Sequence, residues 1–350
     1  MREYTIAAIP GDGIGTEVIA AGLKALEVLA GRDRGFKLKV EHFPWSSDYY
    51  KKHGHYIPDG GLDKLKKFDA IFFGAVGAPD VPDHVSLWGL RLPICQGFDQ
   101  YANVRPARVL PGVTSPLKGG DKIDWVIIRE NSEGEYSGSG GRVHKGLPEE
   151  LATETSVFTR NGVARIHRFA FELARKRSRK HLTLVTKSNA QRHGMVMWDE
   201  IFYEVAKDFP EVETQRILVD AMTTLMVGKP WSLDVAVATN LHADILSDLA
   251  AALSGSLGIA PTANLNPERK FPSMFEPIHG SAFDITGKGI ANPIATFWTA
   301  VMMLEHLGEK EAGARLMKAI ETVTAKKIHT PDLGGEATTE IVTSAVCDAI

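Results

Sequence analysis

Short apolar runs alternate with amphipathic stretches along the chain, and the runs end at Gly, Asp, Asn or Lys. Residues 4–9 form the first run, a Pro-Gly-Asp-Gly-Ile-Gly turn follows, and residues 17–30 show the periodicity of a helix that Gly31 would end. The later runs predict strands at residues 70–73, 124–128, 182–186, 215–219 and 235–238. Strands that alternate with helices favour an α/β fold with a largely parallel sheet.

Length, charge and cysteine content narrow the class of protein. A chain of 350 residues exceeds what one compact core usually accommodates, so we expect two lobes. The net charge of −3, with basic and acidic residues interspersed, gives no indication of a nucleic-acid or membrane partner. Cys95 and Cys347 are too few for a disulfide framework or a thiolate metal site. The N-terminus lacks the apolar core of a signal peptide and no apolar run is long enough to span a bilayer, so we expect a cytoplasmic protein.

Charged side chains follow several predicted strands. Arg129, Lys187 and Asp220 come at the ends of the runs at 124–128, 182–186 and 215–219. In open α/β sheets, ligand sites form just beyond the carboxyl ends of the strands, so these three side chains are candidates for one site.

A pair of aspartates follows the strand at 235–238. Asp244 and Asp248 stand four residues apart on one face of a helix that Thr239 or Asn240 can cap. The apolar positions on a neighbouring face, which we expect to be buried, are Leu241, Ile245 and Leu249. A divalent cation would offset the repulsion of the carboxylates, and oxygen-only ligands favour Mg²⁺ or Mn²⁺. A solvated acidic face explains this pair equally well by itself, but the strand-end residues shift the interpretation towards a site.

Three residues, Lys187 among them, have the chemistry of a dehydrogenase site, although each also has an ordinary explanation. Lys187, near a metal, can act as a general base, whereas a lone lysine after a strand is more often a surface charge. The phenol of Tyr136 can protonate an enolate, although a tyrosine that packs through its ring is commoner. Arg105, which Pro106 restrains, can grip a carboxylate, although most single arginines form surface ion pairs.

Two glycine-rich segments have weaker meaning. Residues 11–15, Gly-Asp-Gly-Ile-Gly, lack the spacing of a dinucleotide fingerprint and of a phosphate-binding P-loop. We therefore predict a tight turn that lines a cleft and not a classical Rossmann site. Residues 136–150 predict a lid, an arm that reaches another subunit, or an ordinary surface loop.

Residues 240–260 resemble the signature of the isocitrate/isopropylmalate dehydrogenase family, and the resemblance covers nearly the whole chain. The other matching segments are residues 10–15, 103–106, 129–136, 276–282 with Asp284, 287–293 and 330–335. The resemblance implies a two-lobed α/β fold that differs from the Rossmann type. One lobe would combine residues 1–100 and 255–350, and the other, residues 101–254, would carry much of a homodimer interface.

The same resemblance implies roles for individual residues. The metal ligands would be Asp220, Asp244 and Asp248, the first of them supplied by the partner subunit. Lys187 would be the general base, also donated across the dimer, and Tyr136 the proton donor. Arg105 and Arg129 would hold the carboxylate of the substrate.

The cofactor loop implied by the resemblance comprises Glu276, His279, Gly280, Ser281, Ala282, Asp284, Ile285 and Asn292. Asp284 can accept hydrogen bonds from the adenosine ribose and would repel a 2′-phosphate, and Ile285 offers that phosphate nothing. We therefore predict NAD and not NADP. The resemblance also allows a monovalent cation such as K⁺, for which no residue pattern is visible.

One departure from the family bears on the substrate. Isopropylmalate and isocitrate enzymes have an additional arginine ten residues before the one that matches Arg105, and here that position is Cys95. Arg91 is a candidate substitute, but Pro93 makes a regular helix there doubtful. Residues 85–90 resemble the branch of the family that acts on tartrate and D-malate.

These observations predict an NAD- and metal-dependent oxidation of a small 2-hydroxy diacid, D-malate or tartrate, followed by β-decarboxylation. The alternatives are a 3-isopropylmalate dehydrogenase, a catalytically silent family subunit, and a metal-dependent lyase or hydrolase. The joint presence of Lys187, Tyr136 and the three aspartates argues against a silent subunit. The cofactor loop argues against a reaction without redox chemistry.

Overall fold

The computed structural model describes residues Met1–Ile350 and divides into two compact units. Unit 1 comprises Met1–Gln100, Arg108–Asp121 and Ala251–Ile350, and unit 2 comprises Tyr101–Ala107 and Lys122–Ala250. These units differ from the expected lobes at residues 108–121 and 251–254, which belong to unit 1. Arg108 donates a hydrogen bond of 2.6 Å to Glu321, and Ser115 donates one of 2.6 Å to the carbonyl of Leu253.

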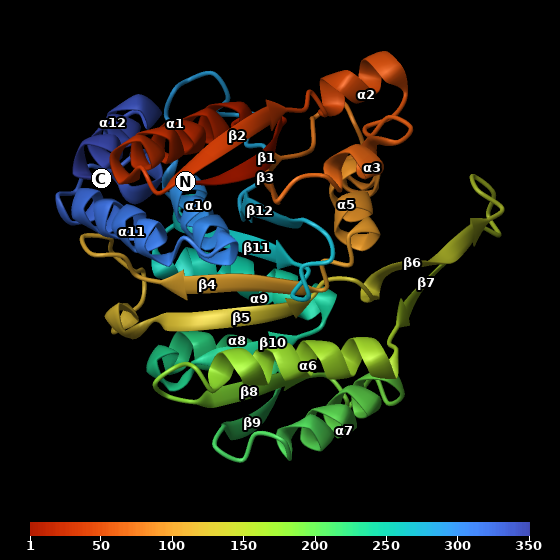
Figure 1. Ribbon diagram of the computed structural model, residues 1–350. Coiled ribbons are helices and arrows are strands. Elements are labelled where there is room, and N and C mark those ends of the chain that lie inside the picture. The colour runs from red at the N-terminus through yellow and green to blue at the C-terminus, as the bar shows by residue number, and fades with distance from the viewer. The chain divides into compact units, whose positions relative to one another are not determined.

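Unit 1 contains five strands in the order β2-β1-β3-β12-β11 (Figure 1). Their bounds are Phe36–His42, Arg2–Gly11, Ala70–Ala75, Ser273–Pro277 and Pro261–Leu265. The pairs β1–β2, β1–β3 and β3–β12 are parallel, and β11–β12 is antiparallel. Strands β3 and β12 are buried along their whole length, as expected of strands with helices on both faces.

The longer helices of unit 1 are α1 (Gly15–Asp33), α10 (Ile294–Leu307), α11 (Lys310–Ala325) and α12 (Thr339–Ala349). The prediction that Gly31 ends the first helix is wrong. Helix α1 continues to Asp33, and Arg34 takes a left-handed conformation with φ 54°, from which its N–H donates to the carbonyl of Ala30. The capping hydrogen bond of Arg34, and not the glycine at position 31, therefore determines where α1 ends.

Several short helical elements lie in the connections of unit 1. They are α2 (Ser47–His53), α3 (Gly61–Leu65), α4 (Asp83–Ser86), the π-helical turn η1 (Leu87–Arg91), α5 (Leu92–Gly97), η4 (Leu257–Ile259) and η5 (Pro331–Leu333). The doubt about a regular helix near Pro93 is resolved in favour of a π-helical turn that continues into α5. Pro93 is the second residue of α5, directly after the π-helical turn.

Unit 2 contains five strands in the order β4-β5-β10-β8-β9. Their bounds are Ala102–Arg108, Asp124–Glu130, Val235–Ala238, His181–Thr186 and Glu213–Leu218. The pairs β5–β10, β10–β8 and β8–β9 are parallel. With the strands of unit 1, these confirm the predicted α/β fold with a largely parallel sheet.

Four helices complete unit 2: α6 (Arg160–Ala174), α7 (Gly194–Ala206), α8 (Val219–Gly228) and α9 (Asn240–Ser254). Figure 1 shows α6 and α7 on one face of the sheet and α8 and α9 on the other. The prediction that Leu241 and Ile245 are buried is wrong, because they are 37% and 57% exposed. The face of α9 that packs inward instead carries Ala243, Leu246 and Ala250.

A two-stranded hairpin projects from unit 2 (Figure 1). Its strands are β6 (Gly134–Val143) and β7 (Leu151–Val157), which pair with each other and with no other strand. Every residue of β7 is exposed. The segment at 136–150 is therefore part of an arm and not an irregular surface loop.

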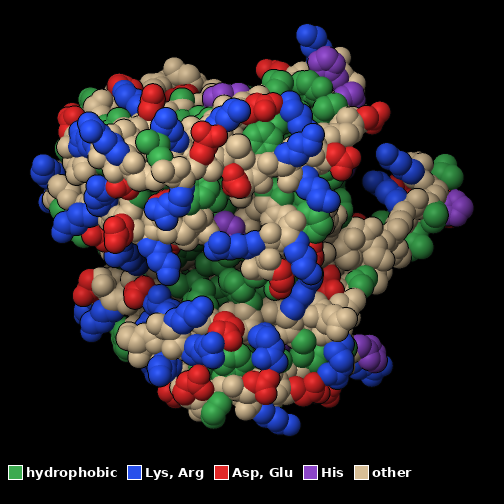
Figure 2. Space-filling model, in the orientation of Figure 1, with side chains coloured by type: hydrophobic (Ala, Val, Ile, Leu, Met, Phe, Trp, Pro, Cys, Tyr) green, Lys and Arg blue, Asp and Glu red, His purple; other side chains and the backbone are tan.

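The face shown in Figure 2 carries no large field of one sign. Figure 2 shows basic and acidic side chains interspersed over the visible face. A small anionic substrate would therefore have to be bound by a local group of cations. None of the helices combines the length and apolar character needed to cross a membrane.

Candidate active site

Three side chains from distant parts of unit 2 converge on Asp244, in the second turn of α9. Arg105 approaches Oδ1 of Asp244 at 3.1 Å, and Arg129 donates to the same oxygen. The hydroxyl of Tyr136 donates to Oδ2 at 3.0 Å. The structure therefore brings together four of the residues predicted from strand ends and motifs.

The two arginines are buried and held at defined angles. Arg105 is 6% exposed and Arg129 is 2% exposed, so neither is an ordinary surface cation. Arg105 donates to Oδ1 of Asn103 at 2.7 Å and to Oγ of Ser247 at 2.6 Å, and Arg129 donates to Oδ1 of Asn240 at 2.8 Å. Because other hydrogen bonds hold the two guanidinium groups, they can present N–H groups to a substrate carboxylate with little loss of side-chain entropy.

Carboxylates in the segment 130–136 place Tyr136 beside α9. Glu135 accepts hydrogen bonds from Oγ1 of Thr239 at 2.8 Å and from the N–H of Leu241 at 3.1 Å, so it holds the first turn of α9. The guanidinium of Arg129 lies 5.2 Å from the centre of the Tyr136 ring. The ring is therefore packed, as in the ordinary case, while its hydroxyl still reaches Asp244.

Glu130 and Glu133 are structural and do not belong to the predicted metal set. Glu133 accepts from the N–H and Oγ1 of Thr159, the N-cap of α6, at 2.9 Å and 2.8 Å. Burial raises the pKa of Glu130 to about 7, and hydrogen bonds from Ser132 and from the N–H of Glu133 oppose that shift. These two carboxylates anchor the segment that carries Tyr136.

Asp248 lies one turn after Asp244 on α9. Desolvation raises the pKa of its carboxyl, and the guanidinium of Arg105 opposes that shift. Two carboxylates with this spacing, one of them partly desolvated, suit a divalent cation that accepts oxygen ligands. Within one chain, however, no three His, Cys, Asp or Glu side chains lie close enough together to hold a metal ion.

Lys187 and Asp220 form a separate pair. Lys187 follows β8, Asp220 is the second residue of α8, and Nζ lies 2.5 Å from Oδ1. The hydrogen bond from Lys187 lowers the pKa of Asp220. The single chain thus places the predicted base and third metal ligand together, but does not bring them into the group around Asp244.

The predicted cofactor residues lie in unit 1, in β12 and in the loop that joins it to α10. The turn at residues 11–15 holds this loop: the N–H of Ile14 donates to the carbonyl of Ser281 at 2.8 Å. A Cβ on Gly13 would lie 2.0 Å from that carbonyl oxygen, so the glycine permits the approach. The turn is therefore tight, as predicted, and it packs against the cofactor loop.

Other residues of the loop are held in different ways. Ile285 packs beside Ile14 and Val18, and Asp284 is exposed. Asn292 donates to Oδ2 of Asp332 at 3.0 Å. Burial lowers the pKa of His279, and its Nε2 has no hydrogen-bond partner. The loop therefore carries one exposed carboxylate, an apolar patch and a half-buried imidazole whose pKa is lowered.

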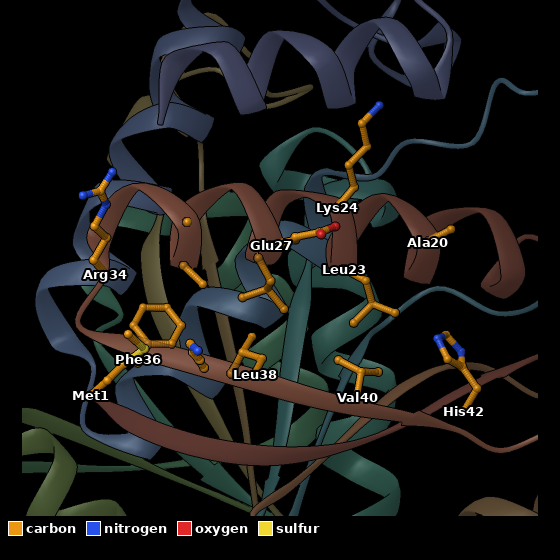
Figure 3. Close-up of a pocket in the computed structure, with 14 residues that line it drawn as sticks. Met1, Ala20, Leu23, Lys24, Glu27, Arg34, Phe36, Leu38, Val40 and His42 are labelled. Carbon is orange, nitrogen blue, oxygen red and sulfur yellow. The ribbon is translucent and has the colours of Figure 1, made fainter.

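A groove of 760 Å³ in unit 1 contains none of the predicted site residues. It lies between α1 and β2, and Figure 3 shows Leu23, Leu38 and Val40 around its apolar interior. The volume of a hollow therefore does not identify the candidate site in this protein.

Comparison with known proteins decides the family. Residues 5–350 match the family model described as isocitrate/isopropylmalate dehydrogenase. The chain belongs to this family. It is 72% identical over 352 residues to the "Probable tartrate dehydrogenase/decarboxylase" of Agrobacterium vitis, which covers 100% of this chain and 98% of the relative.

Other relatives agree with this assignment. The chain is 51% identical over 360 residues to the D-malate dehydrogenase (decarboxylating) of Escherichia coli strain K12, covering 100% of this chain and 99% of that protein. The crystal structure of isocitrate dehydrogenase from Methylococcus capsulatus matches with a TM-score of 0.89 at 36% identity, covering 99% of each chain. The predicted resemblance to this family, and to its tartrate and D-malate branch, is confirmed.

Two residues of this isocitrate/isopropylmalate dehydrogenase family member were not among the predicted site residues. Asn264 lies in a buried network with Arg91 and Glu276. Asp12 is 6% exposed and accepts hydrogen bonds from the N–H and Oγ of Ser47 and from the N–H of Gly77. The aspartate between two glycines was a visible signal for Asp12, whereas nothing near Asn264 in the sequence marks it.

Proposed function

We propose that the chain is an NAD- and divalent-metal-dependent dehydrogenase that oxidises a small 2-hydroxy diacid, D-malate or a tartrate, and decarboxylates the product. The observation that carries this proposal is the convergence of Arg105, Arg129 and Tyr136 on Asp244. That arrangement places two arginines that can bind a carboxylate, a tyrosine that can donate a proton and a carboxylate that can bind a metal ion within hydrogen-bonding distance of one another. The names of the relatives support the same reaction class.

The residues that would hold Mg²⁺ or Mn²⁺ are Asp244 and Asp248, together with Asp220 of the partner subunit. When bound, the cation lowers the pKa of the substrate hydroxyl and draws electrons from the carbonyl that oxidation creates. The arginines now paired with Asp244 would then be released towards the substrate. Arg105 and Arg129 would orient a carboxylate of the diacid, which fixes the carbon that loses hydride.

Proton transfers follow from the two remaining side chains. Lys187 of the partner subunit accepts the proton of the C2 hydroxyl while hydride leaves C2. NAD, when bound, supplies the hydride acceptor. The bond from the neighbouring carbon to its carboxylate then breaks, CO₂ leaves, and the electron pair becomes an enolate. Tyr136 donates its phenolic proton to the enolate carbon, which completes the product.

The cofactor loop supports NAD rather than NADP. The exposed carboxylate of Asp284 can accept hydrogen bonds from the two ribose hydroxyls, and it would repel a 2′-phosphate. Ile285 is an apolar neighbour that offers a phosphate no hydrogen bond. A kinetic preference for NADP would overturn this part of the proposal.

A homodimer with shared sites accounts for surfaces that the single chain leaves uncovered. Val227 on α8 is 49% exposed, and Leu241 and Ile245 on α9 are 37% and 57% exposed. The two-stranded arm of β6 and β7 lacks a third strand, and isolated hairpins are marginally stable in water. A second copy that covers these surfaces would also have its site around Asp244 completed by Lys187 and Asp220 of the first copy. These observations favour an isologous dimer.

The decisive experiment measures NADH formation with Mn²⁺ and K⁺ and compares D-malate, meso-tartrate, (+)-tartrate, isocitrate and 3-isopropylmalate. Preference for D-malate or a tartrate supports the proposal, and preference for 3-isopropylmalate replaces it with the isopropylmalate alternative. No turnover with any substrate moves the weight to a silent subunit. Greater thermal stabilisation by NAD than by AMP separates a dehydrogenase from a lyase or hydrolase.

A further inference from the structure

Arg91 belongs to a buried hydrogen-bonded triad in unit 1. Its Nε donates to Oε1 of Glu276 at 2.8 Å, its Nη2 lies 2.7 Å from the same oxygen, and Nη2 also donates to Oδ1 of Asn264 at 3.2 Å. Asn264 closes the triangle, because its Nδ2 donates to Oε1 of Glu276 at 2.8 Å. The side chains of Arg91 and Glu276 are 11% and 6% exposed.

This geometry limits what Arg91 can bind. A guanidinium grips a carboxylate with two parallel hydrogen bonds, and each such grip uses Nη2 together with Nε or Nη1. Here the polar atoms of Glu276 and Asn264 occupy both Nη2 and Nε. A diacid that replaced Glu276 would leave a buried carboxylate without its cation, which is costly.

The element that carries Arg91 is fixed from a second direction. A Cβ on Gly89 would lie 2.4 Å from the ring of Tyr56, so the π-helical turn η1 packs directly on that ring. The hydroxyl of Tyr56 lies 2.8 Å from Oγ of Ser47, which donates to Asp12 at 2.7 Å. The turn thus joins the strand end of β1 to Glu276 at the start of the cofactor loop. Single turns of π-helix occur frequently at functional sites.

We infer that Arg91 is a positioning residue for the cofactor: it fixes Glu276 and Asn264 where the cofactor loop begins, and it does not replace the missing substrate arginine at Cys95. This inference rests on the proposed function, in which Glu276 belongs to the NAD site. It assigns Arg91 an effect on NAD binding and leaves the grip on the diacid to Arg105 and Arg129. Buried ion pairs often contribute little to the stability of the fold, so a direct test must distinguish a role of Arg91 in NAD binding from a role in stability.

The test is a double-mutant cycle on the full-length protein. The dissociation constant of NAD is measured by titration calorimetry for the wild type, Arg91→Met, Glu276→Gln and the double variant. The KM for D-malate is measured at saturating NAD. Each single change should weaken NAD binding by about tenfold or more, and the double change should cost no more than either single change, because both remove the same interaction. The KM for D-malate should change less than about twofold.

Two further variants make the result specific. Arg91→Lys keeps the charge but presents a point donor in place of a planar fork, so it should restore only part of the NAD affinity, and it serves as the test if Arg91→Met does not fold. Arg2→Met is the matched control, because it removes a 2.8 Å ion pair with Glu309 elsewhere in unit 1. It should leave both constants unchanged.

Three outcomes overturn the inference. A large rise in the KM for D-malate with unchanged NAD affinity would make Arg91 a substrate ligand. Additive losses in the double variant would mean that Arg91 does not act through Glu276. A wild-type protein that binds no NAD would overturn the proposed function itself, and that result is visible before any variant is compared.

Discussion

The ammonium of Lys187 lies 2.5 Å from Oδ1 of Asp220, at the ends of the paired strands β8 and β9. Asp220 nevertheless keeps 64% of its side chain exposed, and Lys187 keeps 30%. An exposed ion pair of this kind contributes only about 0–1 kcal/mol to stability. We therefore expect the pair to contribute little to the stability of its own chain, and the proposed shared site gives it a role in a second subunit.

Co-expression of two inactive variants tests this assignment. Lys187→Ala and Asp244→Asn should each lose about 10²-fold or more of turnover as homodimers. Random pairing of the two chains makes half of the dimers heterodimers with one intact site of two, so about one quarter of wild-type activity should return.

Lys187→Ala co-expressed with Asp220→Asn is the matched control for that experiment. Both residues come from the same donor chain in the proposed dimer, so every site of the heterodimer lacks one of them and no activity should return. Recovery with the control pair, or none with the first pair, would contradict the shared site. Normal turnover in Lys187→Ala would remove the lysine from the mechanism.

Tyr136→Phe should separate the two halves of the reaction. The substitution keeps the ring beside Arg129 and removes the hydroxyl that donates to Asp244 at 3.0 Å. Loss of a general acid typically costs ~10²–10⁴-fold, so formation of the protonated, decarboxylated keto acid should fall further than formation of NADH. Both products are measured in one reaction, with Tyr203→Phe, which alters an exposed tyrosine on α7, as the control. Equal loss of both products would indicate a different role for Tyr136.

Asp248→Asn should weaken metal binding without weakening the fold. The amide keeps the shape of the side chain and removes a carboxylate whose pKa desolvation raises, so the metal-free variant should melt no lower than the wild type. The Mn²⁺ concentration for half-maximal activity should rise by at least about tenfold, and the thermal shift caused by Mn²⁺ should shrink. Glu211→Gln, an exposed acidic position, is the control. Unchanged Mn²⁺ dependence would exclude Asp248 as a ligand.

Acid should destabilise the protein partly through His167. This side chain is fully buried on α6, its ring lies 4.4 Å from that of Trp198, and neither ring nitrogen has a hydrogen-bond partner. Burial lowers its pKa to about 3, below the value of about 6.5 in an unfolded chain. Between these two pKa values the unfolded chain binds a proton that the folded chain does not. The free energy of unfolding is therefore unaffected by protonation of His167 above pH ~6.5, and it decreases by up to ~1.36 kcal/mol per pH unit as the pH falls below that value.

His167→Phe removes this linkage because phenylalanine cannot be protonated and fits an aromatic environment. Its melting temperature, followed by circular dichroism between roughly pH 4.5 and 7.5, should depend less steeply on pH than that of the wild type. His53→Phe alters an exposed histidine and should keep the wild-type slope. An unchanged slope in His167→Phe would assign the acid sensitivity to other groups.

Features that depend on short-range order were predictable from the residues alone. The apolar run at 235–238 is a strand with those bounds, because its composition and the turn signals around it act within a few residues. The spacing of Asp244 and Asp248 places both on one face of α9 for the same reason. The ordered segments of the family matched over residues 5–350, so the fold class was predictable before any contact was known.

The pairing of distant side chains, in contrast, depends on how the whole chain packs. Arg91 and Glu276 are 185 residues apart, and their pairing depends on the packing of a π-helical turn against β12, which no local pattern encodes. Periodicity likewise predicted an apolar face on α9, but it did not determine whether that face is covered, and Ile245 is exposed. Local patterns record which residues favour burial, whereas the partner of each residue depends on how distant elements pack together.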